Sequence, residues 1–135
     1  MISTDGEIAY LAAQQLGRLA TVQPNGTLQN SPVGFSYNAE LETIDIGGRS
    51  MDASQKFRNV RENGRIAFVV DDIASVQPWR VRCLEIRGHA EALTAPADSA
   101  TGSGGAIIRI HPRRIISWGI DPDELSLGKR NVAGK

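Results

Sequence analysis

The sequence has few of the residues that build disulfide frameworks, metal centres or membrane spans. Its 135 residues include one cysteine, Cys83, and two histidines, so an internal disulfide is excluded and a metal cluster lacks its usual ligands. Fifteen basic residues balance fifteen acidic ones, which leaves no net charge to attract nucleic acid or a membrane surface. No apolar run has the length of a signal core or a membrane span. We therefore expect a single cytoplasmic domain in a reducing compartment.

The stretch from Ile44 to Val70 indicates a strand, a glycine break, a short basic helix and a second strand. Residues 43–46 alternate polar and apolar side chains up to Gly47 and Gly48, which is typical of a strand that ends at a glycine break. Asp52 and the glutamine three residues later have the form of a capping box, which predicts that the helix begins at Asp52. Residues 66–70 are continuously apolar, which favours a strand buried on both faces.

The junction between this strand and this helix predicts an anion site. A helix N-terminus offers unpaired N–H groups and the positive end of its dipole. Gly47 and Gly48 let a ligand approach the backbone closely, while Arg49 and Lys56 can place cations beside a phosphate. The alternative is a capped surface helix with solvated charges, since this motif is far looser than a Walker loop.

The segment before this stretch predicts a helix followed by antiparallel strands. Thr4 or Asp5 can cap the helix, and its buried stripe is expected to consist of Ile8, Leu11, Ala12 and Leu16. Strands over residues 18–23 and 27–37 are joined by a Pro-Asn-Gly turn, and with the strand ending at Gly47 they predict a meander. Pro32 lacks an N–H, so its strand should lie at an edge or a bulge.

The later segments complete a six-stranded antiparallel β-barrel with peripheral helices, a mainly β fold class. Further strands are expected at residues 65–71, 84–92, 106–110 and 115–118, separated by loops at 72–78 and 95–105 and by a break at His111-Pro112. Cys83 is out of phase with the long strand, which predicts a bulge nearby. Residues 1–120 form the expected domain and residues 121–135 a C-terminal tail.

Several of these segments, in this order, resemble the pyridoxamine 5'-phosphate oxidase-like family, which has the FMN-binding split-barrel fold. The resemblance rests on Leu-Ala-Thr-Val at 19–22, the Pro-Asn-Gly turn, Ser-Pro-Val-Gly-Phe at 31–35, Lys-Phe-Arg-Asn-Val at 56–60 and Val-Val-Asp-Asp at 69–72. Gly-His-Ala-Glu at 88–91 and Ile-His-Pro-Arg-Arg at 110–114 resemble in particular the actinobacterial branch that uses the deazaflavin coenzyme F420.

This resemblance implies a cofactor pocket formed between the two subunits of a homodimer. Lys56 corresponds to the lysine that contacts the cofactor phosphate, residues 46–49 to the wall of that pocket, and residues 31–34 to the strand along the cofactor ring. Trp79 corresponds to an aromatic residue that flanks the cofactor. Relatives often carry an arginine where this chain has Ser54, and Arg49 is the candidate to replace it. The implied cofactor-binding residues are Ser31, Pro32, Val33, Gly34, Ile46, Gly47, Gly48, Arg49, Lys56, Asn59 and Trp79; catalytic residues remain unassigned.

The function expected from this resemblance is hydride transfer between coenzyme F420 or FMN and a small organic substrate. Such chemistry belongs to the cofactor, so no acid–base constellation in the protein is required. By the same resemblance we do not expect a true pyridoxamine phosphate oxidase, because this chain is short and its tail does not resemble the C-terminal substrate-phosphate segment of those enzymes. F420 is preferred to FMN because of the branch that the sequence resembles.

Two other functions are alternatives to this one. One is a non-catalytic flavin carrier or sensor. The other is a nucleic-acid binder whose arginines would be Arg80, Arg82, Arg109, Arg113 and Arg114. Zero net charge and the absence of an accompanying aromatic cluster disfavour nucleic acid. Neither nucleic acid nor a membrane is therefore an expected partner.

Overall fold

The structure, a computed structural model, describes residues 4–94, 105–120 and 128–132. In chain order the elements are α1 (Asp5–Ala13), β1 (Leu16–Val22), β2 (Leu28–Gly34), β3 (Ser36–Asn38), β4 (Thr43–Ile46), the 3-10 helix η1 (Met51–Ala53), α2 (Gln55–Glu62), β5 (Arg65–Ser75), β6 (Arg80–Leu93), β7 (Ile107–Trp118) and β8 (Gly128–Asn131). The fold is mainly β, as predicted, although these residues form eight strands rather than six.

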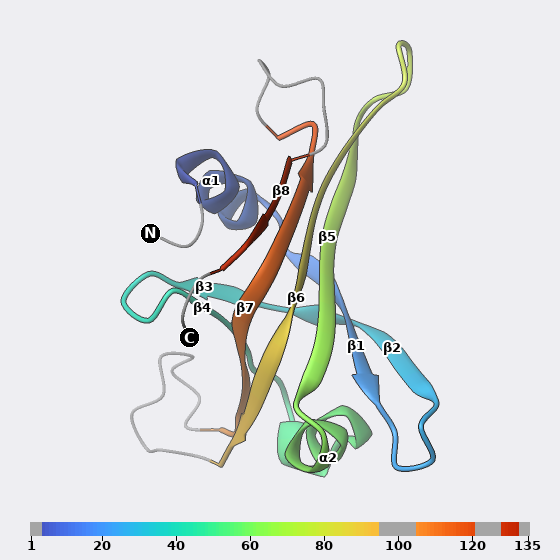
Figure 1. Cartoon of the computed structure of the whole chain (residues 1–135), viewed down its shortest axis with the longest axis vertical. Helices are drawn as coiled ribbons and strands as arrows, with labels where there is room; N and C mark the ends of the chain where they lie inside the picture. The colour runs from blue at the N-terminus through green and yellow to red at the C-terminus, as the bar shows by residue number, and fades with distance from the viewer. Residues whose placement is uncertain (1–3, 95–104, 121–127, 133–135) are drawn as a thin grey trace.

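A single antiparallel sheet curls into the barrel (Figure 1). Its strand order is β2-β1-β5-β6-β7-β4-β3, with β8 paired to β7. Strands β2 and β3 stand at opposite ends of this order, yet Phe35 alone separates them in the chain. The chain therefore links both sheet edges, which explains why the expected meander is wrong: β1 pairs with β2, whereas β3 pairs with β4 and β4 with β7. Pro32 lies on the edge strand β2, as expected.

The barrel core is formed by side chains that alternate along the long strands. On β5, Ile66, Phe68 and Val70 are buried, whereas the intervening Ala67 and Val69 are only half-buried. The prediction of a strand buried on both faces is therefore wrong for the single chain, because no described element covers the outward side of β5.

Helix α1 packs on the barrel through residues other than those expected. Thr4 caps it, and Thr4 and Glu7 form a capping box. Tyr10 and Leu11 are buried, but Ala12 is exposed and Leu16 is the first residue of β1, with 58% of its surface exposed. Leu16 was wrongly placed on the helix because α1 ends at Ala13. The Tyr10 hydroxyl donates to Asp72 Oδ1 at 2.9 Å and ties α1 to β5.

The long strands also differ from expectation. β5 extends to Ser75 and β6 begins at Arg80, so most of the expected 72–78 loop belongs to a hairpin. β7 runs unbroken through Pro112. The register between β6 and β7 shifts between Arg87 and Gly88, and that between β5 and β6 shifts between Ile73 and Ser75, opposite Val81 and Arg80, two and three residues before Cys83. A Cβ on Gly88 would lie 2.2 Å from the His111 carbonyl oxygen, so this close approach requires glycine.

Two segments expected to lack regular structure are only partly covered by the described residues. Of the loop expected at residues 95–105, residues 95–104 lie outside the described residues. Within the expected tail, residues 128–131 form β8 and pair with β7. Among the described residues, no helix has both the length and the apolar character that a membrane crossing requires.

Candidate cofactor site

The start of α2 is built by a serine cap. Ser54 Oγ accepts a hydrogen bond from the Phe57 backbone N–H at 3.2 Å and donates to the Met51 carbonyl oxygen at 2.6 Å. The α-helix therefore begins at Gln55 and not at Asp52, because η1 takes up residues 51–53. The expected capping box is replaced by a simple N-cap, which leaves Lys56 as the second residue of the helix.

The charge at this helix start is opposite to what a helix by itself favours. The first turn of α2 contains no acidic residue and does contain Lys56. The helix dipole favours anions there, and a cation in this place costs about 0.3–1 kcal/mol. The half-buried Lys56 side chain makes no ion pair or hydrogen bond with another described residue. A bound anion would meet the free N–H groups and Lys56 together, so this end of α2 fits a phosphate group.

A network of side-chain hydrogen bonds around the buried Asn59 fixes α2 on β1 and β2. Asn59, which is fully buried, donates to Thr21 Oγ1 at 3.0 Å and to Gln29 Oε1 at 3.1 Å. Its own oxygen accepts from Gln55 Nε2 at 2.7 Å. Because both amide hydrogens are used, the contacts of Asn59 in this structure position the helix start. A direct cofactor contact from Asn59 stays a prediction.

Strand β2 contains residues 31–34, which were predicted to lie along the cofactor ring, and one of their polar groups lies on the face of β2 that contacts α2. Ser31 lies two residues after Gln29, so both side chains point to one face of the strand. The Ser31 hydroxyl oxygen is buried and has no hydrogen-bond partner among the described residues, which is unusual for a buried polar atom. Val33 shares this face and is buried, whereas Pro32 and Gly34 are exposed on the other. Of the four predicted residues, Ser31 and Val33 therefore face α2's side of the sheet.

The segment between β4 and η1 lies close to the start of α2, because η1 directly precedes α2 in the chain. Ile46 is fully buried in the core, Gly47 is half-buried, and Gly48 and Arg49 are exposed. Arg49 lies two residues before η1 and forms no ion pair with a described residue, so a second unpaired cation lies near the α2 start.

Trp79 is not brought to this site within one chain. It lies in the turn between β5 and β6, with 64% of its surface exposed. α2 directly precedes the 11-residue strand β5, and the turn follows it. At about 3.3 Å per residue the two ends of β5 are about 36 Å apart. Figure 1 shows α2 and the tip of this hairpin at opposite ends of the molecule.

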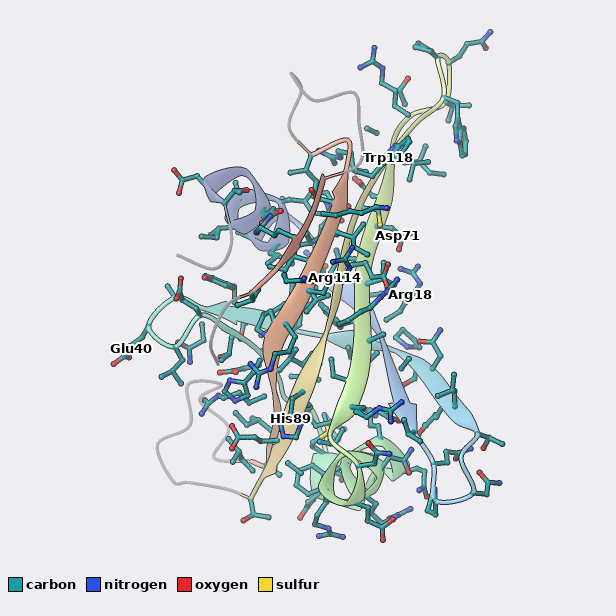
Figure 2. All side chains as sticks on the ribbon, in the orientation of Figure 1. Arg18, Glu40, Asp71, His89, Arg114 and Trp118 are labelled. Carbon is teal, nitrogen blue, oxygen red and sulfur yellow. The ribbon has the colours of Figure 1, made fainter. Side chains whose placement is uncertain are left out.

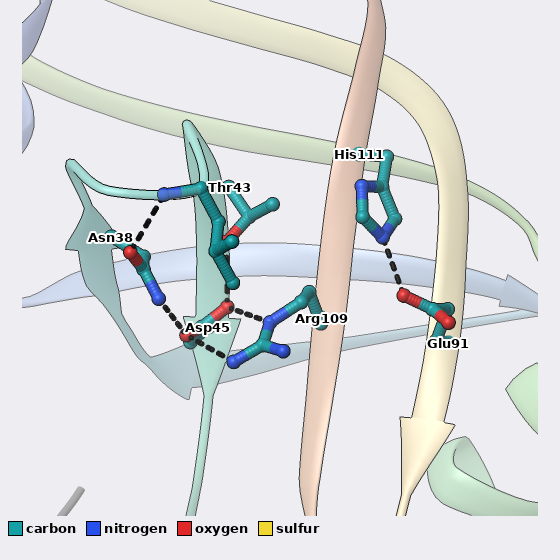
Figure 3. Close-up of polar contacts among 7 residues, drawn as sticks. Asn38, Thr43, Asp45, Glu91, Arg109 and His111 are labelled. Carbon is teal, nitrogen blue, oxygen red and sulfur yellow. Dashed lines mark hydrogen bonds and ion pairs between the residues drawn. The ribbon is translucent and has the colours of Figure 1, made fainter. Parts of the chain in front are cut away.

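Sequence reasoning missed a charged cluster on β3, β4 and β7 (Figure 3). Asp45 has 2% of its side chain exposed and accepts from Arg109 Nε at 3.0 Å and Arg109 Nη2 at 3.1 Å. Asn38 and Thr43 donate to the same carboxylate. Burial acts to raise the pKa of Asp45, but these hydrogen bonds outweigh it and hold the pKa below its usual value. With every oxygen of Asp45 paired, this cluster stabilises the barrel. The sequence feature that could have indicated this cluster is the alternation of Thr43 and Asp45, which places both side chains on one face of the strand.

On the same sheet, His111 Nε2 lies 2.5 Å from Glu91 Oε2. Across residues 4–94, 105–120 and 128–132, no three acidic, histidine or cysteine side chains gather in a way that could hold a metal ion.

Comparison with known proteins places the chain in a family. Residues 5–119 match the family model described as pyridoxamine 5'-phosphate oxidase, and the chain belongs to this family. A 5a,11a-dehydrotetracycline/5a,11a-dehydrooxytetracycline reductase of Streptomyces rimosus is 50% identical over 126 residues, which are 93% of this chain and 88% of that protein.

Solved structures agree with this fold. An F420 reductase is 25% identical with a TM-score of 0.61, over 82% of this chain and 95% of the other. An FAD-binding protein of Mycobacterium smegmatis is 20% identical with a TM-score of 0.65, over 87% and 95%. Both solved structures therefore support the barrel fold of this chain.

Proposed function

We propose that this protein is an oxidoreductase that moves a hydride between coenzyme F420, or else FMN, and a small organic substrate. The observation that carries the proposal is Lys56, a cation that pairs with no described residue and lies in a first helical turn that contains no acidic residue. That arrangement costs stability in the free protein and is offset when a phosphate binds. F420 is preferred because of the branch that the sequence resembles, and the solved F420 reductase agrees with this choice.

The cofactor supplies the hydride chemistry, and the tasks of the chain are to bind and orient it and to exclude water. Lys56 and the N–H groups of α2 hold the phosphate, with Arg49 as a second cation. Ser31, whose hydroxyl has no partner among the described residues, offers a hydrogen bond to the ring. Asn59 holds α2 against β2, so that the phosphate site on α2 keeps a fixed position relative to the strand along the cofactor ring.

The substrate class is proposed from the reductase that is 50% identical to this chain. Its name specifies dehydrogenated tetracyclines. We infer that this chain reduces a carbon–carbon double bond in a polycyclic substrate of that kind. A reduced cofactor, when bound, would supply the hydride and become oxidised, and solvent would supply the proton that completes the new carbon–carbon single bond.

Parallel anaerobic titrations with F420 and FMN, followed by turnover of each reduced cofactor with 5a,11a-dehydrotetracycline, test this proposal. We expect tight binding of one cofactor and its oxidation in a one-to-one ratio with reduced product. Binding of either cofactor without turnover of any polycyclic enone would instead support a carrier or sensor. Failure to bind both would refute the cofactor site itself.

A further inference from the structure

Strands β6 and β7 carry a histidine–carboxylate pair that the proposed function does not use (Figure 3). His111 Nε2 lies 2.5 Å from Glu91 Oε2. Both side chains alternate along their strands with buried core residues, Ile110 on β7 and Ala90 on β6, so they point away from the barrel core. The His111 side chain is 33% exposed, so a small molecule and water can both reach its ring.

The contact between His111 and Glu91 is diagonal across the two strands and depends on a second ion pair. In the sheet register His111 is opposite His89, and Glu91 is opposite Arg109. Arg109 would be the direct cross-strand partner of Glu91. Its Nε and Nη2 both donate to Asp45 instead, which leaves the Glu91 carboxylate to His111. An imidazole ring that is oriented by a carboxylate is the usual arrangement of a histidine in general acid–base catalysis.

The second ring nitrogen of His111, Nδ1, is available for proton transfer. It makes no hydrogen bond with another described residue, and Figure 3 shows it on the side of the ring away from Glu91. The neutral ring that donates its Nε2–H to Glu91 has a lone pair on Nδ1, and the protonated ring carries a proton there. Glu91 therefore orients the ring, and Nδ1 is the atom that can take a proton from water and pass it on.

The pair lies one strand from the predicted wall of the phosphate pocket, residues 46–49. Ile46 is opposite Ile108 on β7, three residues before His111. With strands about 4.8 Å apart and about 3.3 Å per residue, the Cα atoms of Ile46 and His111 are about 11 Å apart. That distance is within the reach of an extended phosphorylated ring system whose phosphate lies beside residues 46–49.

We propose that His111 is a catalytic residue of the proposed reaction, with Glu91 as its positioning residue. The inference rests on the proposed function, because the reduced cofactor of that reaction supplies the hydride. As the hydride forms a new C–H bond at one carbon, the π bond of the substrate breaks, and its electron pair takes the Nδ1 proton of the imidazolium at the neighbouring carbon. The neutral ring keeps its Nε2–H towards Glu91, and solvent restores the lost proton.

The charged groups around His111 determine how this step depends on pH. Glu91 on β6 stabilises the protonated ring. On β7, Arg113 lies two residues further along and opposes protonation, whereas the charge of Arg109 is balanced by Asp45 on β4. The carboxylate in direct contact is the strongest of these influences, so its removal should make the ring lose its proton at a lower pH.

His89 offers a matched control on the same side of the sheet, since it is opposite His111 in the register. Its ring lies against the residue between α2 and β5, because a Cβ on Gly64 would be 2.3 Å from His89 Cε1. Figure 2 shows His89 on β6 near α2. It forms no ion pair with a described carboxylate.

Steady-state reduction of 5a,11a-dehydrotetracycline by the holoenzyme at a series of pH values tests the role of His111. In wild type we expect kcat to fall as the pH rises through the range in which histidine titrates. His111→Gln should lower kcat about 100-fold or more and abolish this fall, with unchanged cofactor affinity. Glu91→Gln should move the fall to lower pH, and His89→Gln should change neither kcat nor its pH dependence.

The outcomes separate this inference from the proposed function. A wild type that binds cofactor but reduces no polycyclic enone would refute the proposed function, and the role of His111 with it. Turnover by wild type with an unchanged kcat in His111→Gln would refute the role of His111 alone.

Imidazole ¹⁵N nuclear magnetic resonance of the cofactor-free protein gives a measurement that is independent of turnover. The signals of His111 are those that disappear in His111→Gln. We expect the neutral ring to carry its proton on Nε2, and Glu91→Gln to lower the pH at which the ring titrates. A neutral ring with its proton on Nδ1 would overturn the proposal, because Glu91 would then not hold the ring in the orientation that proton transfer from Nδ1 requires.

Discussion

Replacing Lys56 by alanine should weaken cofactor binding without lowering the stability of the protein. Lys56 lies in the first turn of α2, where the helix dipole opposes a cation, and no described acidic residue pairs with it. Removing this charge should leave the free energy of unfolding of the cofactor-free protein unchanged or raise it by about 0.3–1 kcal/mol. It should also remove a charge-assisted contact to the cofactor phosphate, which weakens binding by about 1.5 kcal/mol or more, at least tenfold in Kd.

Two measurements on the same samples check this prediction. Urea denaturation of the cofactor-free protein gives the stability change, and fluorescence titration with FMN and with F420 gives the affinity change. Lys129→Ala is the matched control, because Lys129 is an exposed lysine on β8, away from α2. It should alter neither quantity. Unchanged affinity in Lys56→Ala would refute the phosphate site, and a loss of stability with unchanged affinity would show that Lys56 has a structural role.

Three further changes test the structural framework. Asp45→Ala leaves Arg109 without its partner and should lower the free energy of unfolding, measured by urea denaturation, by about 3 kcal/mol. This is the low end of the range for a broken buried ion pair, because 21% of the Arg109 side chain is exposed. The pKa of Asp45 is lower in the folded than in the unfolded protein, so its ionised carboxylate stabilises the fold fully above the unfolded pKa of about 3.9. This stabilisation is lost as the pH falls through the folded pKa. Asp45→Asn should therefore make the free energy of unfolding depend less on pH in the acid range. Asn59→Ala should lower the free energy of unfolding by about 1–3 kcal/mol, because it leaves the buried polar partners of Asn59 unpaired. An unchanged free energy of unfolding would refute the proposed stabilising role of this hydrogen-bond network. Gly17→Ala places a Cβ 2.3 Å from the Phe68 ring and should lower the melting temperature, with a cost of about 1–3 kcal/mol; an unchanged melting temperature would show that the ring can move.

The sequence alone determined the local order of the elements. The Pro-Asn-Gly turn is confirmed, with the Gly26 N–H donating to the Gln23 carbonyl oxygen at 2.8 Å. The strand expected at residues 84–92 lies within β6, where Leu84 and Ile86 are buried in the core. Such features depend on neighbours within a few residues, so periodicity and turn chemistry are sufficient to predict them. The antiparallel barrel followed from the same local signals, whereas anion binding at the α2 start stays a prediction.

Only the tertiary structure decided what depends on contacts between distant segments. The sequence showed no sign that β2 and β3 are opposite edges of one sheet, because strand pairing depends on contacts across the whole chain. It grouped Trp79 with Lys56, although one chain holds them at opposite ends of β5. It also gave the apolar run of β5 two buried faces, whereas the single chain covers one. These differences have one physical cause: side-chain patterns record which surfaces are to be covered, and the assembled fold decides which element or copy covers them.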